Sequence, residues 1–173
     1  MHIIIGFLTA LATVLFALDR LGIDIGWFNP WAWQRRRAWL KQSTGHPAYG
    51  LNKPIDAIAL IATAAAKIDG DLSIEEKEKL KVIFQKTFNQ SEKDAVQLIG
   101  ASVYLLGSGE DVFQAPEKVL KLSLESFSEA QRTSSIELIS EIINVGGQPS
   151  EVQTVFFKKV KKIMTSNASR NEW

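Results

Sequence analysis

The sequence predicts an all-α protein, in which an N-terminal transmembrane helix precedes a compact bundle of about six helices. Three observations lead to this fold class. An uncharged apolar run opens the chain, apolar residues recur at helical spacing from residue 54 to residue 164, and no stretch shows the alternation of a strand. With 173 residues, of which 46% are hydrophobic and 23% charged, the chain can bury one core.

The charges nearly balance, but they are unevenly distributed. The net charge of +1 argues against a dedicated nucleic-acid binder. Residues 1–50 hold five Lys and Arg against two Asp, whereas the remainder holds fifteen basic and seventeen acidic residues, a net of −2. The absence of Cys excludes disulfides, thiol nucleophiles and thiolate metal sites, which suits a reducing compartment.

Residues 1–26 predict a membrane anchor. Ile3 to Leu18 carry no charge, and these sixteen residues reach about 24 Å as a helix, against a hydrocarbon core of about 30 Å. Leu21, Ile23 and Ile25 extend the apolar length if Arg20 snorkels to the interface. A cleaved signal peptide is one alternative, although basic residues do not precede the run, and a buried core helix is another.

Residues 27–53 predict a juxtamembrane segment and linker. Trp favours the headgroup layer, and basic residues beyond an anchor favour the cytoplasmic side and anionic headgroups. We therefore expect a single-pass inner-membrane protein with its N-terminus outside, its domain in the cytoplasm and a lipid bilayer as partner. A Trp-rich helix packed on the domain is the alternative. The interface residues are Trp27, Trp31, Trp33, Arg35, Arg36, Arg37 and Trp39. The turn-rich residues 42–53 predict a linker, with His46 solvated.

Residues 54–164 predict the helical domain, and residues 165–173 a flexible tail. Pro and Ser recur where helices are expected to begin, because Pro suits the first turn and a Ser hydroxyl caps free amides. Gly107 to Asp111 predict a loop. The expected helices begin at Pro54, Ser73, Ser91, Pro116, Ser126 or Ser128, and Pro149.

Two predicted hairpins are related by a shift of 77 residues. The first places an apolar stripe from Ile55 to Ala66 before the turn Asp69-Gly70, and Ser73 with Glu76 forms a capping box. After the shift, Gly70 matches Gly147 and Ser73 matches Ser150. The acidic residues are not kept, since Asp69, Asp71 and Glu76 match Gly146, Gln148 and Gln153. Duplication and independent origin of two capped hairpins both account for this pattern.

The run Ala66-Lys67-Ile68-Asp69-Gly70-Asp71-Leu72-Ser73-Ile74-Glu75-Glu76 resembles the A-x-x-D-G-x-apolar-S-x-x-E segment of the tellurite-resistance TerB-like family. The resemblance covers roughly residues 54–164 and implies an all-helical domain with a second, similar segment. An anchor before such a domain also resembles DjlA-type membrane proteins. Their J-domain signature is not matched, because Ala48 follows His46-Pro47. Co-chaperone activity is therefore not expected.

The family resemblance implies a divalent-metal site at Asp69, Asp71 and Glu76. An EF-hand does not fit, because its first and third loop positions would be Ala65 and Lys67. A weak site completed by Glu75, carbonyls or distant residues is one hypothesis. Turn and capping residues with solvated carboxylates are the other.

No motif predicts an enzyme, since the two His lie outside ligand pairs and Gly107-Ser108-Gly109 lacks the rest of a phosphate loop. A basic cluster near the end of the last helix either complements the helix dipole or docks lipid or an acidic partner. It comprises Lys158, Lys159, Lys161 and Lys162. We expect a non-catalytic interaction or stress-response module with an unidentified protein partner, and a metal-binding or sensing domain is the alternative.

Overall fold

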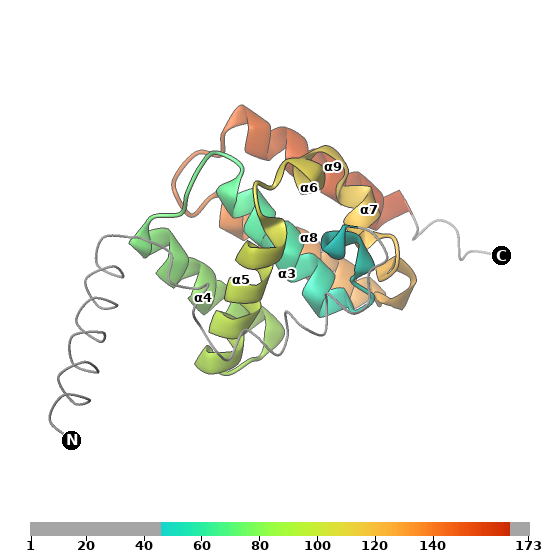
Figure 1. Ribbon diagram of the computed structural model, residues 1–173, viewed down its shortest axis with the longest axis horizontal. Helices are drawn as coiled ribbons and strands as arrows, with labels where there is room; N and C mark the ends of the chain where they lie inside the picture. The colour runs from blue at the N-terminus through green and yellow to red at the C-terminus, as the bar shows by residue number, and fades with distance from the viewer. Residues whose placement is uncertain (1–45, 167–173) are drawn as a thin grey trace, which may run out of the picture.

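The computed structural model describes residues 46–166, and all regular structure in this part of the chain is helical (Figure 1). The all-α fold class is therefore confirmed for this range. Seven α-helices are present here where about six were expected. The elements are η2 (Pro47–Gly50), α3 (Pro54–Lys67), α4 (Ile74–Phe88), α5 (Glu92–Leu106), α6 (Glu110–Gln114), α7 (Pro116–Leu120), η3 (Leu124–Ser126), α8 (Glu129–Ile143) and α9 (Glu151–Ser166).

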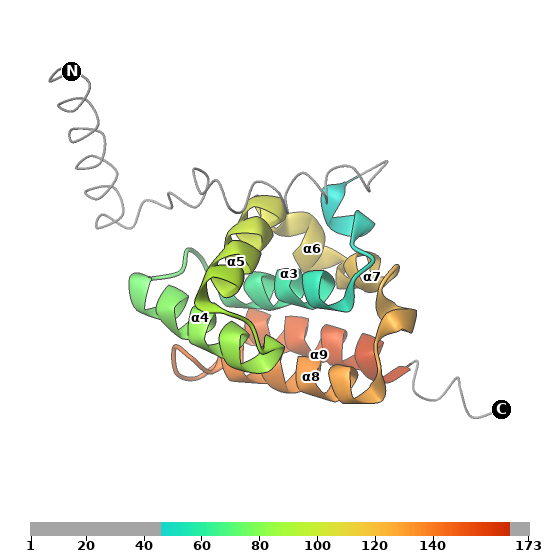
Figure 2. The same cartoon turned by 90° about the horizontal axis from the view of Figure 1, so that it is seen from below.

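Helix α3 lies in the middle of the bundle. Helix α5 packs on one side of it, and α8 and α9 pack on the other (Figure 2). The sequence predicted one apolar stripe, but every residue from Asp56 to Ala65 is buried. A helix that is apolar nearly all round is expected to be enclosed in this way, and its many Ala residues allow neighbouring helices to approach closely.

The helix starts follow the Ser residues that the sequence singled out. The backbone amides of Glu76, Asp94 and Gln131 each donate to a Ser hydroxyl at 3.2 Å, and the acceptors belong to Ser73, Ser91 and Ser128. Ser128, rather than Ser126, caps α8. These local signals worked because a capping bond involves residues three positions apart and needs no tertiary partner.

Helix α6 was not predicted. The sequence indicated a loop from Gly107 to Asp111, whereas a helix begins at Glu110, directly after Gly109 with φ 81°. Five residues are too few to establish a helical stripe. Tertiary packing accounts for the helix, because Val112 is fully buried.

The chain enters the domain before Pro54. Ala48 and Leu51 are 0% and 1% exposed, so the end of the expected linker belongs to the core. His46 is the N-cap of η2: its Nδ1 accepts from the Ala48 amide at 3.3 Å, and its Nε2 lies 3.5 Å from Asp111. His46, expected to be a solvated loop residue, keeps a 34% exposed side chain and in addition caps this turn.

The end of α9 is fixed by the buried Arg132. Its Nη1 donates to the Met164 carbonyl at 3.2 Å, and its Nη2 donates to the Leu124 carbonyl. A guanidinium near a helix C-terminus satisfies carbonyls that have no intrahelical partner. Helix α9 continues through Thr165 and Ser166, two residues that were expected to begin the tail.

Several predicted features lie outside the described residues. They are the anchor at 1–26, the membrane-interface residues between 27 and 39, and the tail from 167 onward. Within residues 46–166, none of the helices combines the length and apolar character needed to cross a bilayer.

Candidate functional site

The first elbow of the domain joins α3 to α4. Gly70 has φ 140°, a conformation that residues with a Cβ rarely adopt, so the glycine allows the chain to reverse here. The capping box then starts α4: the Ser73 amide donates to Glu76 Oε2 at 2.8 Å, and the Glu76 amide donates to Ser73 Oγ at 3.2 Å. The Glu76 carboxylate is thus committed to the beginning of α4.

The second elbow joins α8 to α9 and has the same construction. Gly147 has φ 118°. The Ser150 amide donates to Gln153 Oε1 at 3.1 Å, and the Gln153 amide donates to Ser150 Oγ at 3.1 Å. Helix α9 begins at Glu151, which is 77 residues after the start of α4 at Ile74 (151 − 74 = 77). The structure therefore reproduces the predicted offset between the hairpins.

The two elbows lie against each other. Ser150 Oγ donates to Asp69 Oδ1 at 2.8 Å, and Gln153 Nε2 donates to the Ala65 carbonyl at 3.3 Å. Between the elbows is a cavity of about 180 Å³. Its polar walls come from Asp69, Glu76, Gln148 and Gln153.

The three residues of the predicted metal site do not converge. Asp69 and Glu76 line the cavity, but Asp71 does not. The Asp71 side chain is 94% exposed and pairs with Lys67 Nζ at 3.0 Å, and this hydrogen bond holds the pKa of Asp71 below its ordinary value. Across residues 46–166 there is no group of three or more His, Asp or Glu side chains that could hold a metal ion.

The two carboxylates that remain, those of Asp69 and Glu76, fit a capping role better than a metal site. The amide of Ser73 lowers the pKa of Glu76, since its hydrogen bond favours the charged carboxylate. Asp69 accepts from Ser150, and the other two polar walls are neutral amides. A Ca²⁺ ion needs six to eight oxygen ligands, and two carboxylates already held by hydrogen bonds do not supply them.

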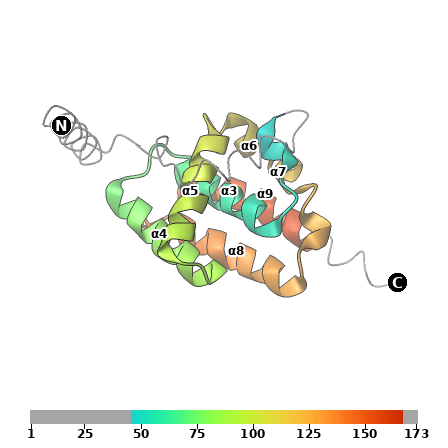
Figure 3. The same cartoon turned by 60° about the horizontal axis from the view of Figure 1, so that its bottom comes forward.

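A larger groove lies between α4 and α8, next to α9. Helices α4 and α8 are neighbours along this side of the bundle (Figure 3). The groove has a volume of about 1050 Å³, and much of its surface is apolar. Val82 is 58% exposed, which is unusual for a large aliphatic residue beside other apolar groups. The apolar lining comprises Val82, Ile83, Ile136, Val145 and Phe157.

The rim of the groove is acidic. On the α4 side, Glu75 pairs with Lys79 Nζ at 2.8 Å, and Glu78 pairs with Lys81. On the α8 side, Glu137 and Glu141 are exposed, and neither pairs with a cation among residues 46–166. Like charges four residues apart repel each other. Helix α8 therefore presents two uncompensated carboxylates beside an apolar surface.

The predicted basic cluster on α9 is divided between faces of the helix. All four of its lysines are exposed, but only Lys161 lines the groove. Successive residues turn by about 100° around a helix, so Lys159 lies on the opposite flank, and Lys158 and Lys162 point outward. Among residues 46–166, Lys161 and Lys79 are the only cations that line the groove, whereas four Glu line it.

The charges of α8 were a signal for this groove in the sequence, but the spacing of apolar residues did not show it. Helix α8 carries three Glu and one basic residue, and that residue, Arg132, is buried. Glu137 and Glu141 therefore have no basic partner at helical spacing.

Comparison with protein-family models, with curated proteins and with solved structures finds no match.

Proposed function

We propose that this protein is a membrane-anchored, TerB-like helical domain that acts as a non-catalytic interaction or stress-response module on the cytoplasmic face of the inner membrane. The anchor and its orientation rest on the apolar run in residues 1–26 and the basic residues that follow it. The family proposal rests on the segment from Ala66 to Glu76 and on the two capped hairpins.

The observation that carries the interaction function is the α4–α8 groove. Its volume of about 1050 Å³ reaches the upper end of pockets for small ligands, and it is open along two helices, so it suits a segment of a chain. Burial of apolar side chains would supply the affinity.

The charges around the groove define the partner. Four Glu and two Lys line it, a net of −2, and the carboxylates of Glu137 and Glu141 form no ion pair within residues 46–166. A peptide segment with large apolar residues and adjacent Lys or Arg would complement both features. We therefore propose a basic, apolar segment as the ligand of the groove.

Photo-crosslinking in membranes from the producing cells tests this function. A benzophenone side chain in place of Val82 sits in the groove, and one in place of Val96 serves as the control, because Val96 is 38% exposed on α5 and does not line the groove. We expect adducts from position 82 on a segment with net positive charge and large apolar residues. No adduct, an acidic segment, or the same adducts from position 96 would contradict the proposal.

A further inference from the structure

We infer that the segment bound in the α4–α8 groove is residues 27–41 of a second copy of this chain. The inference rests on the proposed docking function of the groove and goes beyond it by naming the ligand. The groove has an apolar floor and a rim with a net charge of −2. Any occupant has to match both features along the two helices.

Residues 27–41 have the matching chemistry. The segment contains Phe28 and four of the five Trp of the chain, and it has no Asp or Glu. Arg35, Arg36, Arg37 and Lys41 give it a charge of +4. Trp and Arg are among the residues that most often dominate binding energy at interfaces, because Trp buries a large ring and Arg forms forked hydrogen bonds with carboxylates.

The geometry of the domain indicates that a second copy supplies the segment. The described chain begins at His46, and η2 packs against α5 and α7. The groove helix α8 lies on the other side of α3 from η2, and α4 lies beyond α5, against α5 and α8 (Figure 2). The five steps from Lys41 to His46 span at most about 18 Å, whereas a path around two helices, each about 10 Å across, is longer.

The groove of a neighbouring copy and the anionic headgroups of a bilayer then compete for one segment. Both offer negative charge beside an apolar layer. Copies held in one membrane meet at a high effective concentration, so docking between copies does not require tight binding in solution.

The test uses the purified full-length chain in detergent micelles, with equal amounts of ¹⁵N-labelled and unlabelled copies. A benzophenone side chain replaces Val82 in one sample and Val96 in the control, and mass spectrometry identifies the joined peptides. We expect the Val82 sample to give adducts on residues 27–41 that join labelled to unlabelled chains. Adducts within one copy only, adducts elsewhere in the chain, or equal yields from the control position would overturn the inference.

Exchanging the charges of the segment and of the groove provides a second test. A variant that had only lost structure would not regain adduct yield in it. A chain with Arg35→Glu, Arg36→Glu and Arg37→Glu should lose about tenfold in adduct yield. A second copy that carries Glu137→Lys and Glu141→Lys should restore much of that yield, because the charges are then complementary again. Failure of the exchange to restore any yield would count against the assignment.

The pattern of failure separates the two proposals. If the purified chain gives no adduct on residues 27–41, but position 82 joins another basic segment in native membranes, the self-docking inference is wrong and the docking function stands. If position 82 joins nothing in either setting, both are wrong.

Discussion

Ser150 Oγ donates a hydrogen bond to Asp69 Oδ1 at 2.8 Å and thereby joins the residue that caps α9 to the elbow that follows α3. The two residues are 81 positions apart in the sequence. Ser150 also caps its own helix, so one hydroxyl serves both hairpins. The bond gives Asp69 a structural role in the place where the sequence predicted a metal ligand.

Asp69→Ala should lower the free energy of unfolding by about 1 kcal/mol, since it removes the acceptor of this exposed bond. Asp71→Ala is the matched control: Asp71 is 94% exposed on the same elbow, so the loss of its surface pair with Lys67 should lower the free energy of unfolding clearly less. Urea unfolding of the full-length chain, followed by circular dichroism, measures both. Equal losses in the two variants would show that the link between the hairpins does not contribute.

Glu76→Gln should change the pH dependence of stability. The pKa of Glu76 lies below its ordinary value of 4.5 because the Ser73 amide donates to the carboxylate. A lowered carboxyl pKa stabilises the folded chain above pH 4.5, and that contribution is lost as the pH falls through the lowered value.

The Gln variant keeps a capping box, as the native pairs Ser128–Gln131 and Ser150–Gln153 do. We therefore expect it to be less stable than the wild type by less than about 1 kcal/mol at pH 7. The difference should narrow as the pH falls below 4.5. Urea unfolding across this pH range provides the measurement, and a difference independent of pH would exclude the carboxylate as the cause.

Leu51→Ala should destabilise the domain by about 2–5 kcal/mol, the usual cost of removing a buried Leu side chain. Leu51 is 1% exposed and belongs to the core, although the sequence placed it in a linker. Asn52→Ala changes the next residue, which is exposed, and should be close to neutral. Thermal unfolding of the two variants distinguishes a core residue from a linker residue. Two midpoints equal to that of the wild type would restore the linker interpretation.

Divalent metal should not stabilise the domain. A metal at a hundred times its dissociation constant would add about 2.7 kcal/mol to the free energy of unfolding. Asp69 and Glu76 are already held by hydrogen bonds and Asp71 points elsewhere, so we expect no shift of the unfolding midpoint with millimolar Ca²⁺, Mg²⁺ or Zn²⁺. If one of these ions raised the unfolding midpoint of the wild type but not that of Asp69→Ala, the metal hypothesis would be supported again.

Local signals in the sequence were sufficient for most helices. Ser73, Ser91 and Pro54 marked helix starts correctly, because caps and first-turn residues act within a few positions, whereas α9 begins at Glu151, two residues after the expected start at Pro149. The predicted stripe on α3 was incomplete, since Ala57 and Leu60 are also buried. A single helix cannot show how many neighbours will enclose it.

The candidate site was less predictable, because it depends on tertiary structure. The groove joins Val82 of α4 to Glu137 and Glu141 of α8, and no local pattern brings these helices together. The sequence also did not show that Asp69 lines the cavity while Asp71 does not, because this depends on which side of the elbow each carboxylate faces. The short helix α6 required the burial of Val112, which the sequence pattern did not show.

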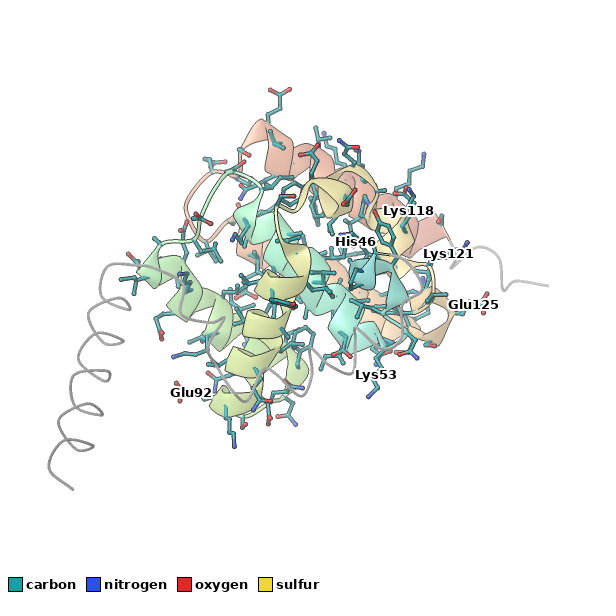
Figure 4. All side chains as sticks on the ribbon, viewed as in Figure 1. His46, Lys53, Glu92, Lys118, Lys121 and Glu125 are labelled. Carbon is teal, nitrogen blue, oxygen red and sulfur yellow. The ribbon has the colours of Figure 1, made fainter. Side chains whose placement is uncertain are left out.

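The charge of the groove rim provides the most direct test of the account. Three full-length chains, each with a benzophenone in place of Val82, are compared in native membranes: the otherwise unaltered chain, one with Glu137→Lys and Glu141→Lys, and a control with Glu117→Lys and Glu125→Lys. The control makes the same change of charge at exposed positions outside the groove, and Glu125 lies far from α4 (Figure 4).

If each reversed rim charge costs about 0.7 kcal/mol, the adduct on the basic segment should fall about tenfold in the groove variant and stay unchanged in the control. Equal adduct yields from all three chains would contradict the claim that the acidic rim of the α4–α8 groove recognises a basic segment.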